Sequence, residues 1–229
     1  MKMLSKITKL TNRKFYNKWL YKVTLRCEGC DVLRFVPFTE IIKFCQEENY
    51  DSTHYFPSWR RAHNNKENLN KICTFLMNYP EDNYNLRIER SSMDIYTNDK
   101  DMYDKISFEC LSLVVHRFQP NAENIDILSQ DNHCIIVKKL PKKRYNFRVY
   151  LLPHKMAKDR DGKESLLEWM KNQSPKITCS PSIQRWFLET EWNWDRRYVL
   201  VEDEATLLMF KLRGADIVGR IYKFVVCDK

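Results

Sequence analysis

Glycine is scarce in this chain. Only 4 of its 229 residues are glycine, well below the average usage of roughly 7%. A loop that cradles phosphate groups needs several closely spaced glycines, because side chains would keep the backbone away from the phosphates. No such loop occurs in the sequence. This excludes the nucleotide-binding fingerprints of P-loop proteins and of dinucleotide-binding enzymes.

Long apolar runs are also missing. No stretch is long enough to span a bilayer, and residues 1–15 are dotted with lysine and arginine where a secretory signal would be apolar. Several of the 8 cysteines stand inside apolar runs, as small buried hydrophobic residues do. We therefore expect reduced thiols and a cytoplasmic location, which is the host cytosol if the gene is viral.

Recognisable metal and catalytic sites are few. Cys27 and Cys30 have the CxxC spacing of a zinc site, but no second CxxC, CxxH or HxxxH pair supplies the other ligands. The HxH pair that rolling-circle nickases use to hold their metal is also absent. We expect a hairpin turn at residues 27–30, no bound metal, no cofactor and no assigned catalytic residue.

Positive charge is what the sequence has in excess. The formal net charge is +9, from 39 lysines and arginines against 30 acidic residues. This balance favours a polyanionic partner, with nucleic acid before an anionic membrane; a solvated lysine face is the alternative. Abundant Lys, Asn, Ile and Tyr with little Gly is the bias of an AT-rich coding sequence. We therefore expect a viral or phage gene.

A strand–helix–strand pattern occurs twice, at an offset of 104 positions. Residues 198–226 combine an apolar strand, an acidic helix start, a short helix and an alternating strand, and residues 95–118 follow the same order. Asp99 aligns with Asp203. Carboxylates favour the amino end of a helix, so we expect the acidic residues at both helix starts to cap the helices and not to bind metal.

The apolar patterns in the rest of the sequence predict the other strands and helices of the fold. Further strands are predicted at residues 19–26, 32–36, 86–90 and 145–152, with a strand or loop beginning at Ile177. Further helices are predicted at residues 37–48, 67–79, 163–172 and 182–189. We predict an α+β fold of two tandem ferredoxin-like (βαββαβ) halves, with an inserted hairpin strand and helix in the first. A single larger α+β domain with one continuous sheet is the alternative.

The domain boundaries follow from this order. We expect a basic N-terminal arm at residues 1–18, a first half at 19–120, a basic linker at 121–144 and a second half at 145–229. Residues 49–65, which are polar and aromatic, are expected to form a loop.

The densest positive run stands at the end of the predicted linker. Five cations in seven residues cannot be buried unpaired, so they face solvent or an anion. Contacts with phosphates release counterions, and an adjacent aromatic ring can stack on a base. A solvated linker and a nuclear-import signal fit the same residues. The residues that we assign to nucleic-acid binding are Lys138, Lys139, Lys142, Lys143, Arg144 and Tyr145.

Two further segments interleave arginine with aromatic residues, as grooves for single-stranded nucleic acid do. Each tryptophan in them is at least as well explained by a place in a core. The residues assigned here are Trp59, Arg60, Arg61, Trp194, Arg196 and Arg197.

Aromatic residues on central strands are a third place for bases, because ferredoxin-like sheets often bind RNA through them. The sequence offers Trp19 or Tyr21 with Tyr96, and Phe147 or Tyr150 with Tyr198. The RNP1 motif of RNA-recognition modules is absent. The likeness is therefore one of topology, and topology alone does not fix function.

Together these features predict a non-enzymatic protein that binds single-stranded or structured RNA or DNA. The alternatives are a structural or interaction protein of a virion or replication complex, and a metal-independent ribonuclease that uses His63 or His154 with a nearby Tyr or Lys. We expect no membrane partner, and the sequence does not predict an oligomeric state.

Overall fold

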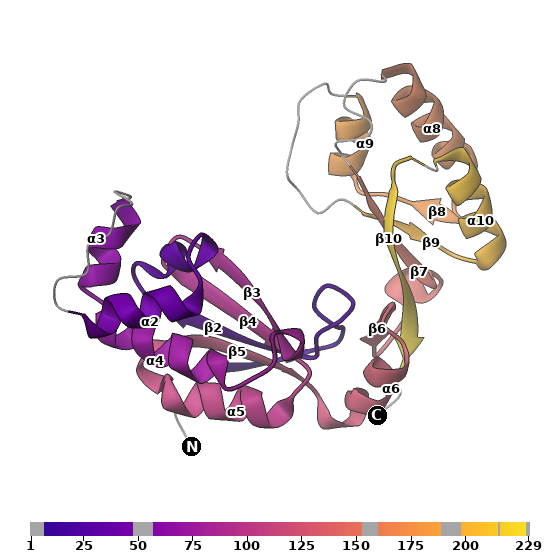
Figure 1. Ribbon diagram of the computed structural model, residues 1–229. Helices are drawn as coiled ribbons and strands as arrows, with labels where there is room; N and C mark the ends of the chain where they lie inside the picture. The colour runs from indigo at the N-terminus through magenta and orange to yellow at the C-terminus, as the bar shows by residue number, and fades with distance from the viewer. Residues whose placement is uncertain (1–6, 48–56, 153–159, 189–197, 215, 228–229) are drawn as a thin grey trace. The chain divides into compact units, whose positions relative to one another are not determined.

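The computed structural model describes residues 7–47, 57–152, 160–188, 198–214 and 216–227, without the side chains of residues 57–59 and 160–161. Within these ranges the protein is a mixed α+β structure with two five-stranded sheets and eight α-helices (Figure 1). The chain divides into two compact units, Met1–Asn132 and His133–Lys229. None of the described helices has both the length and the apolar composition needed to cross a membrane.

The first unit is built on one sheet. Its strands, in spatial order, are β1 (Thr8–Thr11), β5 (Val114–Pro120), β2 (Tyr21–Arg26), β4 (Ser92–Thr97) and β3 (Tyr84–Glu89). β1 runs parallel to β5, and the other pairs of neighbours are antiparallel.

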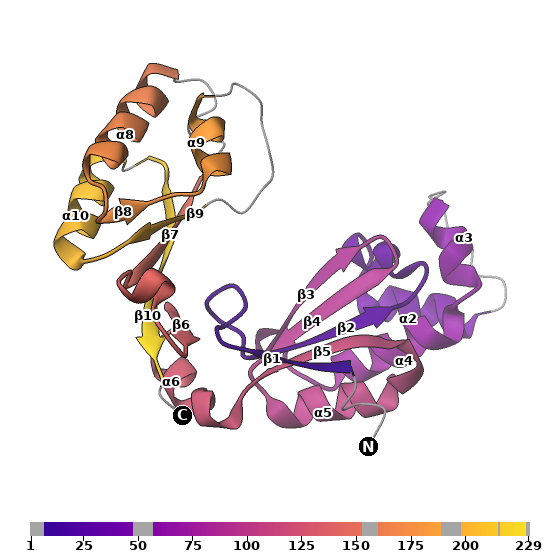
Figure 2. The ribbon, with the colours of Figure 1, turned by 180° about the vertical axis from the view of Figure 1, so that it is seen from behind.

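The helices of this unit are α2 (Phe38–Gln46), α3 (Pro57–His63), α4 (Lys66–Met77), α5 (Lys100–Glu109) and α6 (Ile125–Gln130). Figure 1 and Figure 2 show α4 and α5 along the same side of the sheet. Alternate residues of β2 point to that side, and the Tyr21 ring lies 5.0 Å from the Tyr103 ring of α5.

The second unit contains the other sheet. Its strands, in spatial order, are β6 (Cys134–Val137), β10 (Val218–Val226), β7 (Phe147–Leu151), β9 (Tyr198–Val201) and β8 (Ile177–Thr178). β6 is parallel to β10, and the other pairs are antiparallel. The helices of this unit are α8 (Arg160–Asn172), α9 (Pro181–Leu188) and α10 (Glu204–Arg213). Val149 and Val199 of the sheet form one core with Phe187 and Phe210 of the helices.

The pattern that repeats in the sequence also repeats in the structure. α5 and α10 begin and end 104 positions apart, as do the starts of β5 and β10. The Asp99 carboxylate accepts hydrogen bonds from the backbone N–H groups of Asp101 and Met102, and the Asp203 carboxylate accepts one from Thr206. The predicted capping role of both aspartates is confirmed.

The predicted hairpin strand at residues 32–36 is wrong. Residues Cys30–Arg34 form a short 3-10 helix, η1, which buries Cys30 and Val32. The reason lies in the pairing of β2, which has β4 on one side and β5 on the other. A strand returning directly after β2 would find no free edge there. The helix predicted after it is present as α2.

Elements also occur in the segments expected to lack them. β1 lies within the predicted arm at 1–18, and α6 and β6 lie within the predicted linker at 121–144. α3 occupies part of the predicted loop at 49–65 and begins at a proline, a residue favoured in the first turn of a helix. β1 and β6 have four residues each, too few for a clear alternation in the sequence.

Candidate nucleic-acid interface

The second sheet has an aromatic face opposite its helices, which we call the outer face. Successive side chains of a strand point to opposite sides. Val149 packs in the helix-covered core, whereas Arg148 and Tyr150 of β7 lie on the other side. The outer face also carries Tyr198 and Leu200 of β9 and Tyr222 and Phe224 of β10.

Arg148 lies among the aromatic rings of this face. Its guanidinium carbon is 4.4 Å from the ring centroid of Tyr198 and 5.3 Å from that of Phe224. The Tyr150 ring lies 5.8 Å from Tyr198 and 5.7 Å from Tyr222. No carboxylate of the described residues forms an ion pair with Arg148, and its buried Nε has no hydrogen-bond partner. A cation with neighbouring rings is a surface on which a base can stack and a phosphate can bind.

The basic run adjoins this face. Leu140 packs against the cluster of Ile135, Tyr222 and Phe224. Lys142 Nζ donates a hydrogen bond of 3.4 Å to the Thr178 hydroxyl of β8. These contacts bring residues 138–144, which we call the basic loop, to the outer face. Its lysines are exposed, and within the described ranges none of them forms an ion pair: Lys138, Lys139, Lys142 and Lys143.

The basic loop has a defined backbone. Residues Pro141–Lys143 form a 3-10 turn, η5, in which Lys142 and Lys143 have φ values of 49° and 61°. Such left-handed conformations are uncommon for residues other than glycine. The Lys143 N–H donates to the Leu140 carbonyl at 2.9 Å, which helps to hold the turn.

Arg144 and Tyr145 anchor the end of this loop. Arg144 Nη2 donates to Glu202 Oε2 at 2.7 Å, so its charge is already balanced. Tyr145 is buried at 3% exposure, and its hydroxyl donates to the Pro175 carbonyl at 2.9 Å. The expected stacking role of Tyr145 is therefore wrong, because its ring belongs to the interior of the second unit.

The second predicted cluster belongs to the other unit. Arg60 and Arg61 are exposed on α3, and Arg61 Nη2 forms an ion pair of 3.0 Å with Asp31. Because the basic loop lies in the second unit, neither unit by itself contains both clusters. Trp59 is part of α3, but its side chain lies outside the described part of the structure. Trp194, Arg196 and Arg197 lie outside the described residues altogether.

Gly29 positions the helix that carries these arginines. Its φ is 82°, and a Cβ atom placed on it would be 2.3 Å from the backbone nitrogen of Ala62. The backbone of α3 therefore packs directly on Gly29. Any other residue here would need both a left-handed backbone and a displaced helix.

The first sheet has a lysine, Lys22, at the position equivalent to Arg148. Lys22 pairs with Phe118 in its sheet, as Arg148 pairs with Tyr222 in the second. Lys22 Nζ lies 3.0 Å from Asp94 Oδ2, so its charge is neutralised. The residue 104 positions after Asp94 is an aromatic one, Tyr198. The cation of the first sheet thus has a carboxylate where the cation of the second has a ring.

A turn of the first unit covers the same region of the first sheet. The Phe15 ring lies 5.6 Å from Tyr96 and 5.9 Å from Phe118. Tyr96 is 3% exposed. Two other rings that were candidates for stacking, Trp19 and Tyr21, are also buried. In the second sheet Arg148, Tyr150 and Tyr198 are partly exposed, whereas Tyr222 and Phe224 are buried at 3% and 4% exposure.

The cysteines do not form a metal centre in the described ranges, where no three or more histidine, cysteine and acidic side chains gather closely enough to hold an ion. Burial raises the pKa of Cys27 and of Cys30 to about 12, which disfavours the thiolates that bind zinc. His63 is exposed, with its ring 6.2 Å from Phe44. His154 lies outside the described residues.

Sequence reasoning missed Arg148. The alternation in residues 145–152 places it beside Tyr150 on one face. Its aromatic surroundings, however, also include Tyr222 and Phe224, which are far along the chain. Comparisons of this chain with protein-family models, with curated proteins and with solved structures found no match.

Proposed function

We propose that this protein binds single-stranded RNA or DNA without cleaving it, through the outer face of the second sheet and the basic loop. The observation that carries the proposal is Arg148, which lies among aromatic rings with no paired carboxylate in the described structure. Exposed lysines that form no ion pair with a described residue lie on the adjoining loop. Rings can contact any base and lysines any phosphate, so we expect little sequence preference.

We also propose that the two units are tandem ferredoxin-like halves. The support is a shared strand order: β5-β2-β4-β3 in one unit and β10-β7-β9-β8 in the other. When β1 and β6 are left out and the other four strands of each unit are numbered along the chain, both orders read fourth, first, third, second. β1 and β6 are then equivalent additions, each parallel to the last strand. A viral or phage gene and a cytosolic location belong to the same proposal and rest on composition.

A second candidate is an interaction protein of a larger assembly. α10 favours it, because apolar side chains of this helix are exposed on the side away from the core. The exposed fractions are 57% for Leu208, 51% for Met209 and 70% for Leu212.

Binding of a labelled 20-nucleotide single strand across a salt series tests the proposal. Each phosphate contact to a single strand contributes about −0.7 to the slope of log K against log salt, so contacts from the four lysines give a slope of about −3. The single strand should bind more tightly than a duplex of the same length, because only its bases are free to stack. RNA should stay intact in EDTA.

A charge-matched pair of variants locates the interface. Lys138→Gln, Lys139→Gln and Lys143→Gln together should weaken binding at least tenfold and make the slope shallower by about 2. The control removes three other exposed lysines: Lys71→Gln, Lys171→Gln and Lys211→Gln. Equal losses in both variants would show that the net charge, and not this loop, attracts the strand. No binding even at low salt would leave the interaction protein as the better candidate.

A further inference from the structure

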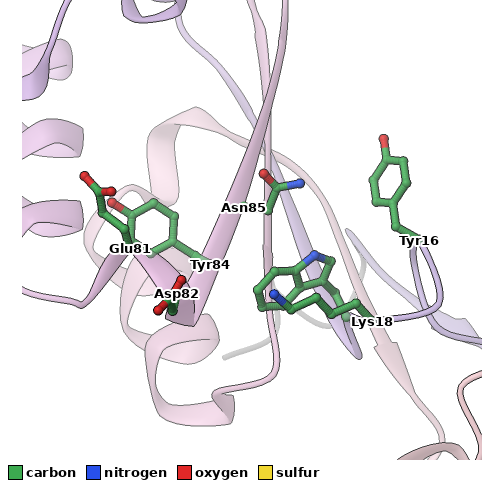
Figure 3. Close-up of a pocket in the computed structure, with 7 residues that line it drawn as sticks. Tyr16, Lys18, Glu81, Asp82, Tyr84 and Asn85 are labelled. Carbon is green, nitrogen blue, oxygen red and sulfur yellow. The ribbon is translucent and has the colours of Figure 1, made fainter.

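A pocket of about 390 Å³ lies in the first unit, beside the start of β3 (Figure 3). Its volume is within the usual range for small-molecule sites. Trp19 is among its lining residues, and Figure 3 shows Tyr16 and Lys18 on one side and Glu81, Asp82 and Tyr84 on the other. The outer face of the second sheet does not include any of these residues.

A tight turn builds the first side of the pocket. The Phe15 carbonyl accepts hydrogen bonds from the N–H groups of Lys18 at 3.0 Å and Trp19 at 2.9 Å. Tyr16 and Asn17 have φ values of 53° and 59°, which projects the Tyr16 ring from the turn at 46% exposure. Arg87 Nη1 donates to the Tyr16 hydroxyl at 3.3 Å. The ring is therefore exposed and held in place.

The other side carries negative charge. Glu81 and Asp82 are exposed in the 3-10 turn Glu81–Asn83, and within the described ranges neither forms an ion pair. Burial, with a smaller contribution from the nearby Glu81 carboxylate, raises the pKa of Tyr84. Two carboxylates in a chain of net charge +9 repel a phosphate and accept hydrogen bonds from N–H groups.

A cation already occupies the aromatic surface. Lys18 Nζ lies 4.3 Å from the ring centroid of Trp19, and the Lys18 side chain is exposed. The pocket thus combines rings, carboxylates and one movable lysine. A suitable ligand is flat, offers N–H donors to the carboxylates, and carries a negative group that Lys18 can meet at the rim.

We infer that this pocket binds a guanine base. Guanine presents N1–H and N2–H₂ side by side, and a carboxylate accepts both. Adenine and cytosine place an unprotonated ring nitrogen beside their amino group, so its lone pair faces the carboxylate. Uracil and thymine place carbonyl oxygens on both sides of their N–H group. The carboxylates therefore favour guanine, and the exposed ring of Tyr16 offers it a stacking surface.

This inference deepens the proposed function, because single-stranded nucleic acid is the source of the base. It assigns to the first unit a selective contact that the second unit's outer face lacks. An unpaired guanine of a single-stranded nucleic acid would bind selectively in this pocket. The basic loop would bind the phosphates of any sequence.

Calorimetric titration of the full chain with GMP, AMP, CMP and UMP tests the pocket. GMP should bind at least tenfold more tightly than the other three. N7-methyl-GMP should bind at least as tightly as GMP, because its positive charge adds attraction to the rings and carboxylates. The double variant Glu81→Gln and Asp82→Asn should lose the preference for GMP at least tenfold. Glu123→Gln with Asp126→Asn, an exposed pair in the same unit, should keep it.

The outcomes separate the two proposals. Oligonucleotide binding without a preference for GMP would overturn the guanine pocket alone. A retained GMP preference without oligonucleotide binding would leave the pocket standing and overturn the proposed function. If the four nucleotides bind within threefold of one another, the carboxylates do not recognise guanine and the inference is wrong.

Discussion

Lys22 and Arg148 occupy the same register position in their sheets, opposite Phe118 and Tyr222. What differs is the neighbouring strand, which supplies Asp94 in one sheet and a tyrosine in the other. A carboxylate at 3.0 Å cancels a lysine's charge, whereas a ring leaves the guanidinium charge in place. At the residue scale, a single position therefore separates a neutral sheet face from a cationic one.

Replacement of Arg148 measures this difference. Arg148→Ala should cost about 1–2 kcal/mol of binding free energy for a single strand, roughly a five- to thirtyfold loss of affinity, because a half-buried cation on aromatic rings is removed. Fluorescence anisotropy provides the measurement. Lys22→Ala is the matched control and should leave the affinity unchanged. An unchanged affinity for Arg148→Ala would remove the outer face from the interface.

Gly29 should be intolerant of any side chain. Gly29→Ala should lower the free energy of unfolding of the first unit by about 1–3 kcal/mol, the cost of a strained left-handed residue, with the contact to Ala62 adding to it. Chemical denaturation measures the change. Gly214→Ala, with a nearest approach of 3.2 Å and no positive φ, should cost less. Equal costs would mean that α3 moves freely away from Gly29.

At the scale of helices and strands, the elements specified by local sequence were the predictable ones. The helix predicted within the repeated unit at residues 95–118 is observed as Lys100–Glu109, because its aspartate cap and its apolar period both lie within that unit. β1 and β6 were missed because their partners, β5 and β10, lie some 80 to 110 residues away. Sequence separation also explains which site residues could be predicted. The exposed lysines form a local run that the sequence shows directly, whereas the surroundings of Arg148 depend on the distant strand β10.

The Asp203 cap gives a pH dependence that can be measured. The N–H of Thr206 donates to its carboxylate at 2.7 Å and lowers the pKa of Asp203. Since the folded-state pKa is the lower one, this stabilisation is present above the unfolded value of about 3.9 and is lost as the pH falls through the folded value.

Asp203→Asn should keep the cap hydrogen bond, because asparagine caps as well as aspartate, and lose the charge. At pH 7 the variant should be less stable by about 0.3–1 kcal/mol, and the difference should shrink as the pH falls below about 3.9 and disappear below the folded-state pKa of Asp203. Urea denaturation of the second unit at several pH values measures this. A difference that persists in acid would assign the effect to packing. Asp216→Asn, at an exposed residue outside the described helices, should show no such dependence.

At the scale of the whole molecule, the chain consists of two units with separate sheets. Each has its own buried side chains, for example Val23 and Ile106 in the first and Val149 and Phe210 in the second. A sheet with a covering helical layer is the usual requirement for independent folding. The basic loop and the outer face lie in the second unit, and the pocket lies in the first.

Residues 1–132 and 133–229 should therefore fold as separate proteins. We expect cooperative thermal unfolding of each fragment by circular dichroism. The second fragment should keep most of the salt-dependent affinity for a single strand. If only the full chain unfolds cooperatively, the division into units does not reflect independent stability, and the two binding surfaces cannot be assigned to separate parts.

The place of β10 in its sheet has a consequence during synthesis. This strand lies between β6 and β7 and is the last element of its sheet to be translated. At ribosomal rates of about 5–20 residues per second, roughly 5 to 20 s pass between the end of the first unit and residue 226. For that interval β6 and β7 leave the ribosome without the partner that joins them. A nascent chain stalled before β10 would expose both edges to chaperones, while the first unit could already be complete.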